Sequence, residues 1–170
     1  MSSKRDLFGG AITATLPTSL IDASDLRQIP DTQEVFLSPT SDVSIILEIL
    51  ESVPATDLID AAKYHFNSLA HDNDATAATV LTVTTIPNDR GDGTPSPTVL
   101  SGTQQVRKFN RTNADDVRIY MAVYRVPGKS VDAVLTMNVP FVDQAQLDEA
   151  RDVFNAAARS LAIVDYALFA

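Results

Sequence analysis

Residues 131–139, Val-Asp-Ala-Val-Leu-Thr-Met-Asn-Val, carry the clearest strand pattern of the chain. One face of this stretch holds Val131, Ala133, Leu135, Met137 and Val139, and the other holds Asp132, Thr136 and Asn138. Because successive side chains of a β-strand point to opposite sides of the sheet, this alternation predicts a half-buried strand. The fold therefore includes a β-sheet with an apolar face.

A second strand is predicted immediately upstream, over residues 118–126. Both of its faces are apolar or aromatic, which is expected of a strand inside a sheet that is covered on both sides, so we place it centrally. Five more β-like runs occur, at residues 11–16, 34–37, 44–50, 78–86 and 98–107.

Two segments have helical spacing instead. In residues 57–69 apolar side chains recur at helical intervals, and Asp57 and Asp60 stand in the first turns, where the helix dipole favours acids. Asp143 is an expected N-cap, with Gln146 three residues after it, and a longer apolar stripe follows. Both segments are predicted to be amphipathic helices that pack on the sheet.

The order of these segments predicts an α+β fold. Strands in the second half of the chain follow one another without intervening helices, joined by turn-forming stretches such as residues 88–97, so their pairing should be mainly antiparallel. We expect a mainly antiparallel sheet of about six to seven strands covered by helices. With 170 residues, 45% of them apolar, and no internal repeat, the chain is expected to form one domain over residues 1–170.

Charge is distributed unevenly along the chain. The net charge is −9, and residues 6–60 alone carry ten acids against one base, Arg27. An acidic surface repels nucleic acid and anionic lipid and attracts basic proteins. No apolar run is long enough to span a bilayer, and the first ten residues lack the apolar region of a secretory signal. We therefore expect a protein partner, and neither nucleic acid nor a membrane.

Residues that usually carry chemistry are scarce. The chain has no cysteine and two histidines, His65 and His71, and it lacks glycine-rich phosphate-binding motifs and a nucleophile elbow. We expect no metal, no organic cofactor and no catalytic residue. A carboxylate-dependent hydrolase remains as an alternative, and it would require a perturbed carboxyl in a concave pocket.

Three pieces of the first third carry the most specific signal. They are Leu7-Phe8-Gly9-Gly10-Ala11-Ile12, the stretch Ile21-Asp22-Ala23-Ser24-Asp25-Leu26-Arg27-Gln28-Ile29-Pro30-Asp31-Thr32-Gln33-Glu34-Val35-Phe36, and Ser44-Ile45-Ile46-Leu47-Glu48-Ile49-Leu50-Glu51. Together they resemble the MOG-type Ran guanine nucleotide release factors, small proteins of nuclear transport. The resemblance extends more loosely to Tyr64-His65-Phe66 and to the C-terminal residues.

The resemblance implies a fold, a function and a site. The family's fold is a PsbP-like α/β/α sandwich, which agrees with the pattern described above. Family members bind the small GTPase Ran and favour release of its nucleotide without catalysing a reaction themselves. For this chain we accordingly expect a monomer that acts in the nucleus and the cytoplasm. Glu48 and Glu51 are implied to contact the GTPase, with Asp31 and Glu34 as further candidates. A PsbP-like structural subunit is the alternative that shares the fold.

Local physics leaves two questions open. If residues 44–51 form one regular strand, Glu48 and Glu51 point to opposite faces, so either the strand ends or bulges near Leu50 or only one glutamate faces the partner. Asp31 has a purely local alternative, because it follows Pro30 where an aspartate favours a turn. Asp22 and Asp25 are expected to cap a short helix rather than to bind a partner.

Overall fold

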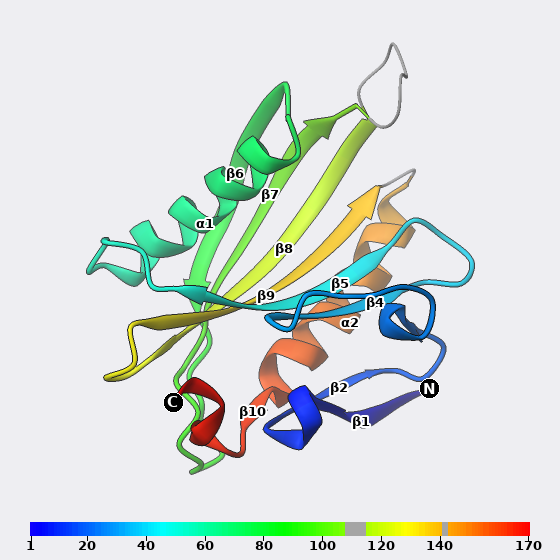
Figure 1. Ribbon diagram of the computed structural model, residues 1–170. Coiled ribbons are helices and arrows are strands. Elements are labelled where there is room, and N and C mark those ends of the chain that lie inside the picture. The colour runs from blue at the N-terminus through cyan, green and yellow to red at the C-terminus, as the bar shows by residue number, and fades with distance from the viewer. Residues whose placement is uncertain (108–114, 141–142) are drawn as a thin grey trace.

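The computed structural model describes residues 1–107, 115–140 and 143–170, and in this part of the chain two antiparallel sheets form the fold (Figure 1). The large sheet has the strand order β3-β4-β5-β9-β8-β7-β6. Its strands are β3 (Ile21–Asp22), β4 (Gln33–Leu37), β5 (Ser44–Glu51), β6 (Ala77–Thr85), β7 (Thr98–Val106), β8 (Asp115–Val126) and β9 (Val131–Pro140). The small sheet has the order β1-β2-β10, with β1 (Ser2–Leu7), β2 (Ile12–Pro17) and β10 (Ala162–Ile163).

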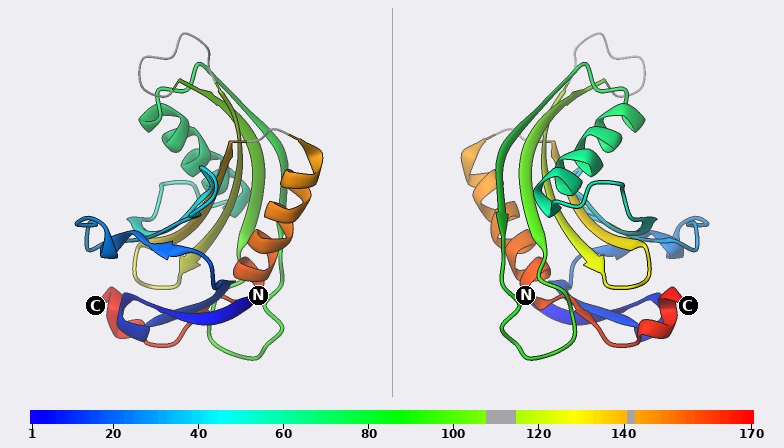
Figure 2. Two further views of the ribbon diagram at one scale, coloured as in Figure 1. Left: turned by 90° about the vertical axis from the view of Figure 1, so that its right-hand side faces the viewer. Right: turned by 90° about the vertical axis from the view of Figure 1, so that its left-hand side faces the viewer.

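Helices cover both faces of the large sheet. Figure 2 shows α1 (Leu58–Asp72) on one side of the sheet and α2 (Gln144–Ser160) on the other, beside the small sheet. Three short 3-10 helices complete the described elements: η1 (Phe8–Gly10), η2 (Ala23–Asp25) and η3 (Tyr166–Phe169). The predicted α+β fold, an antiparallel sheet between helices, is confirmed.

Both long helices begin at the predicted caps. The side chain of Asp57 accepts a hydrogen bond from the amide of Ile59, and that of Asp143 accepts one from the amide of Gln146. Each cap satisfies an amide that the first turn of a helix leaves without a backbone partner. Asp22 likewise caps η2 by accepting from the amide of Ser24, which agrees with the local role expected for it.

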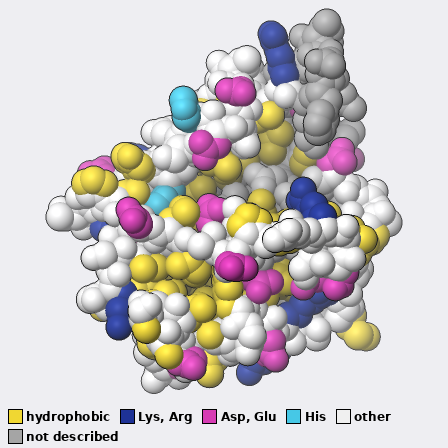
Figure 3. Space-filling view, viewed as in Figure 1, with side chains coloured by type: hydrophobic (Ala, Val, Ile, Leu, Met, Phe, Trp, Pro, Cys, Tyr) yellow, Lys and Arg dark blue, Asp and Glu magenta, His cyan; other side chains and the backbone are white. Residues whose placement is uncertain are grey.

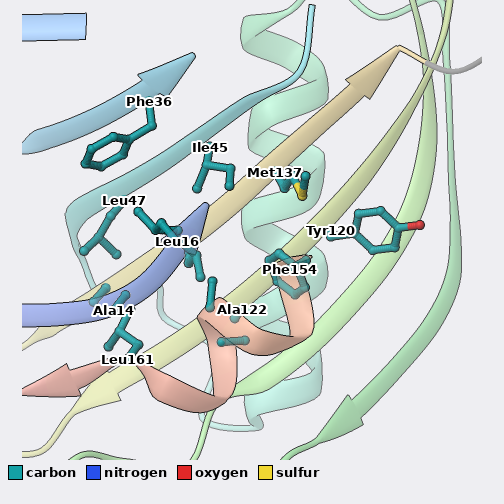
Figure 4. Close-up of a cluster of buried hydrophobic side chains, with 14 of the residues drawn as sticks. Ala14, Leu16, Phe36, Ile45, Leu47, Tyr120, Ala122, Met137, Phe154 and Leu161 are labelled. Atoms are coloured by element: carbon teal, nitrogen blue, oxygen red, sulfur yellow. The ribbon is translucent and has the colours of Figure 1, made fainter. Parts of the chain in front are cut away.

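The larger core lies between the large sheet, α2 and the small sheet (Figure 4). Tyr120 of β8 stacks on Phe154 of α2 with their ring centroids 5.6 Å apart, and Ile45 and Leu47 of β5 are fully buried in the same cluster. Burial of a side chain of this size is worth about 1.5–3 kcal/mol, so this cluster fixes β5 against the rest of the sheet.

A second core lies under α1. Phe66 of α1 packs on β7 at Gly102. A Cβ at this position would meet the Phe66 ring at 2.7 Å and the Thr79 carbonyl oxygen at 2.8 Å. Glycine is therefore required for the helix to approach the sheet this closely. Leu100 of β7 itself and Val123 of the neighbouring β8 belong to the same core.

One prediction about the sheet is wrong. β9 was expected to be half-buried, yet Asp132, Val134 and Thr136 on its second face are all buried. The reason is its position in the middle of the large sheet, where α1 covers the face that alternation suggested was polar. The polar residues on this face of β9 are buried, and Asp132 makes hydrogen bonds there with His65 and Arg125. The short strands β1, β3 and β10 were not predicted.

Candidate functional site

β5 positions the two glutamates singled out in the sequence. It pairs with β9 in continuous register, from Ser44 opposite Asn138 to Glu51 opposite Val131, so it neither bulges nor ends before Glu51. Glu48 therefore lies on the α1 face of the sheet, and Glu51 lies on the opposite face. Glu48 is half-buried, and Glu51 is exposed.

The other side of β5 is only partly paired. β4 begins at Gln33, which is paired with Glu48, so within the described residues no β4 residue pairs with residues 49–51. One backbone hydrogen bond, from the Ile49 amide to the Thr32 carbonyl oxygen at 2.9 Å, joins β5 to the residue before β4. Beyond Glu48 the strand thus forms an edge of the sheet, and an approaching surface meets side chains from both faces there. We call residues 48–51 the binding edge.

Glu48 is held in place by its neighbour across the ladder. The Gln33 side-chain amide donates a hydrogen bond to the Glu48 carboxylate. A small hollow of about 70 Å³ adjoins Glu48 between β5 and α1, and His65, Leu69 and Asp72 of α1 also line it. The carboxylate of Glu48 is therefore held in one orientation beside this hollow.

Asp31 and Glu34, the two candidates upstream of β5, lie outside the binding edge. Asp31 is exposed in the turn before β4, where the amide of Gln33 bonds to the carbonyl of Pro30. Glu34 lies next to Gln33 in β4 and so points to the opposite face from Glu48, where its carboxylate accepts a 2.8 Å hydrogen bond from the amide of Phe8. Glu34 thereby links the large sheet to η1.

Glu34 has the perturbed carboxyl that a hydrolase would require. Burial raises the pKa of Glu34 above its ordinary value, the hydrogen bond from Phe8 opposes this, and the charge of Asp22 adds to the rise. Together with Asp6, Asp22 and Asp31 it lines a hollow of about 460 Å³. One oxygen of Glu34 is occupied by the Phe8 amide, however, which suits an anchor better than a general acid.

The four predicted residues consequently do not form one cluster. Glu48 and Glu51 share the binding edge, Asp31 lies in the turn before the strand that flanks this edge, and Glu34 faces away from Glu48. The space-filling view in Figure 3 shows carboxylates distributed over this side of the molecule among apolar side chains. Acidic side chains on this face are therefore spread out and do not gather in one cluster.

The sequence did not indicate a buried ionic cluster close to the binding edge. Asp132 of β9, completely buried, accepts hydrogen bonds from His65 of α1 at 2.8 Å and from the Nε of Arg125 of β8 at 2.9 Å. Burial alone would raise the pKa of Asp132, but the hydrogen bonds and charges of His65 and Arg125 lower it below its ordinary value. Only the pairing of β8 with β9 could have suggested the Arg125–Asp132 contact.

In residues 1–107, 115–140 and 143–170, no three His, Asp or Glu side chains are grouped so that they could hold a metal ion. In the same part of the chain, neither helix has the length and apolar character needed to cross a membrane.

Comparison with known proteins gives consistent matches. A family model described as Ran-interacting Mog1 protein matches residues 5–140. The Ran guanine nucleotide release factor of Danio rerio is 35% identical, over 97% of this chain and 98% of its own length. The nuclear import protein mog1 of Schizosaccharomyces pombe is 33% identical, over 96% and 98%. The crystal structure of the Saccharomyces cerevisiae Ran-binding protein Mog1p matches with a TM-score of 0.81 at 29% identity, covering 100% of this chain and 99% of that one.

Proposed function

Because the chain belongs to the Ran-interacting Mog1 family, we propose that it binds a Ran-type small GTPase and promotes release of the bound guanine nucleotide. The observation that carries this proposal is the match to release factors over almost the whole chain. In this role the protein regulates a GTPase, makes or breaks no covalent bond, and supports protein transport between nucleus and cytoplasm as a monomer.

The binding edge is the surface that supports this function best. Residues 6–60, which include the binding edge, carry a net charge of −9. A basic partner surface is therefore attracted to this part of the molecule. Glu48 is pre-oriented by Gln33, and Glu51 is free to meet a cation. We assign Glu48 and Glu51 as the principal partner contacts and Asp31 as an outlying one. The geometry of Glu34 favours an anchoring role, so its contribution to binding should be small.

Release of nucleotide then follows from linkage. If the protein binds the nucleotide-free GTPase more tightly than the loaded one, it must weaken nucleotide binding by the same factor. A carboxylate of the binding edge has two chemical routes to this preference. It can pair with a lysine or arginine that otherwise holds phosphate, or it can disturb the magnesium site of the GTPase.

A binding experiment with three forms of the partner tests the proposal. Purified Ran is prepared with GTP, with GDP and free of nucleotide, and each form is passed over the immobilised protein. We expect the nucleotide-free form to be retained most strongly. Equal retention of all three forms would exclude release by linkage, and no retention of any form would exclude Ran as the partner.

A further inference from the structure

We propose that Asp132, held between His65 and Arg125, is the positioning residue of the binding edge. This inference rests on the proposed function and deepens it, because it names buried residues that set the geometry of the surface without touching the partner. Asp132 joins the hairpin of β8 and β9 to helix α1 through His65, and it holds Arg125, which in turn binds the loop of residues 52–57 that follows Glu51.

The position of Asp132 in the sheet is the first part of the argument. Asp132 is paired with Arg125 on one side and with Leu50 on the other, so the three residues form one row across β8, β9 and β5 on the α1 face. Leu50 lies between the two glutamates of the binding edge. The charged pair is therefore adjacent, in the ladder, to the residues that contact the partner.

Arg125 carries the connection to the loop. Its guanidinium binds both oxygens of Asp132, at 2.9 and 3.1 Å, and also donates to the carbonyl oxygens of Ala55 at 2.5 Å and Val53 at 3.3 Å. The Ser52 amide donates to the carbonyl of Ser130 at 2.9 Å. The Ser52–Ser130 bond therefore holds the start of the loop after Glu51, and the Asp132–Arg125 pair holds the residues that follow through the carbonyls of Val53 and Ala55.

His65 carries the connection to α1. Its ring donates to, or shares a proton with, the second oxygen of Asp132 at 2.8 Å, and both side chains are almost entirely buried. The same histidine lines the hollow beside Glu48. The carboxylate thus fixes the helix on one side of the binding edge and the loop at its end.

Stability alone does not account for this cluster. Burying charges costs desolvation, and replacement of a buried ion pair by apolar side chains of similar volume is often neutral or stabilising. The cluster does, however, require one arrangement of α1 and of the loop, because His65 and Arg125 share the two oxygens of Asp132 while Arg125 also bonds to the loop carbonyls. If that arrangement is only partly populated, the apparent Kd for a partner is the intrinsic Kd divided by the populated fraction.

The test uses Arg125→Lys, which keeps the positive charge but cannot hold both oxygens of Asp132 and two carbonyls at once. Two quantities are measured on the full chain: hydrogen exchange of the amides in residues 52–57 of the free protein, and the Kd for nucleotide-free Ran. We expect exchange in this segment to accelerate by about tenfold or more, with α2 unchanged. The Kd should rise by the reciprocal of the fraction of molecules that keep the wild-type arrangement.

Two variants control for general destabilisation. Leu147→Ala removes buried volume from the core under α2, on the opposite face of the sheet, and it should lower the melting temperature while exchange in residues 52–57 and the Kd stay near those of the wild type. Asp132→Asn, which keeps the shape and removes the charge, should act as Arg125→Lys does.

The exchange measurement decides the inference without the partner. Unchanged exchange in residues 52–57 of both Arg125→Lys and Asp132→Asn, or acceleration spread evenly over the chain instead of concentrated in this segment, would overturn the positioning role. A wild-type protein that does not bind Ran would overturn the proposed function instead, while the exchange result would still decide whether Asp132 positions the binding edge.

Discussion

Glu48 and Glu51 belong to the same regular strand and project from opposite faces of the large sheet. They share a surface only because β4 starts opposite Glu48 and leaves the rest of β5 as an edge. A partner that approaches this edge contacts both carboxylates, whereas a partner that lies flat on one face contacts only one of them.

Neutralising each glutamate separately distinguishes these two geometries. We expect Glu48→Gln and Glu51→Gln each to weaken binding of nucleotide-free Ran by about 1.5–3 kcal/mol, the usual contribution of a hydrogen bond to a charged group. Because the two side chains lie on opposite faces, the effects should add in the double variant. Titration of labelled Ran measures the Kd. Loss of affinity in only one single variant would show that the partner covers one face.

Glu34→Gln should separate the anchoring residue from the contact residues. The amide oxygen of glutamine still accepts from Phe8, and the substitution removes a charge whose burial is unfavourable. Since the folded-state pKa of Glu34 is raised, its contribution to stability is full below the unfolded pKa of about 4.3 and declines as the pH rises towards the folded pKa.

The variant should therefore gain stability relative to the wild type as the pH rises above about 4, with the Kd for Ran unchanged. Urea unfolding at several pH values and the same Ran titration check both expectations. A loss of binding comparable to that of Glu48→Gln would place Glu34 in the interface instead.

Association with Ran should be electrostatically steered. Because the acidic surplus resides in residues 6–60, the association rate should fall steeply from low salt to about 0.15 M, while the dissociation rate changes less. Stopped-flow mixing at a series of salt concentrations measures both rates. An association rate that does not depend on ionic strength would argue against the acidic surface as the docking surface.

Gly102→Ala tests the packing of α1 on the sheet. Its new methyl group would overlap the Phe66 ring and the Thr79 carbonyl, and such overpacking typically costs about 1–3 kcal/mol. The matched control is Gln105→Ala at an exposed position of the same strand, which should change the free energy of unfolding by no more than about 0.5 kcal/mol. Equal stability of the two variants in urea would show that α1 does not depend on this close approach.

The sequence predicted those features that depend on local periodicity. Residues 118–126 and 131–139 are strands, and Asp57 and Asp143 cap helices. The period of two put Glu48 and Glu51 on opposite faces only if residues 44–51 form one regular strand, and the continuous register with β9 meets that condition. Features that depend on distant contacts were missed. Asp132 lies 67 positions from His65, and no local pattern records that α1 covers the polar side of β9.

The edge character of residues 49–51 escaped prediction for the same reason. It depends on where β4 begins relative to β5, and the register of two strands is set by cross-strand packing. β1 and β10 were missed because β1 is largely polar and exposed and β10 has two residues, so neither has the alternation of a half-buried strand.

The rate at which fluorescent GDP leaves Ran tests the central claim most directly. It is measured with the wild type, with Glu48→Lys/Glu51→Lys, and with Glu149→Lys/Asp152→Lys, an equal change of charge on the exposed side of α2. For a desolvated pair, reversal should cost about 2–5 kcal/mol of binding. We predict that the β5 variant loses the acceleration of release, that the α2 variant keeps it, and that both melt near the wild-type temperature. Equal loss in both variants, or full acceleration by the β5 variant, would contradict the assignment of Glu48 and Glu51.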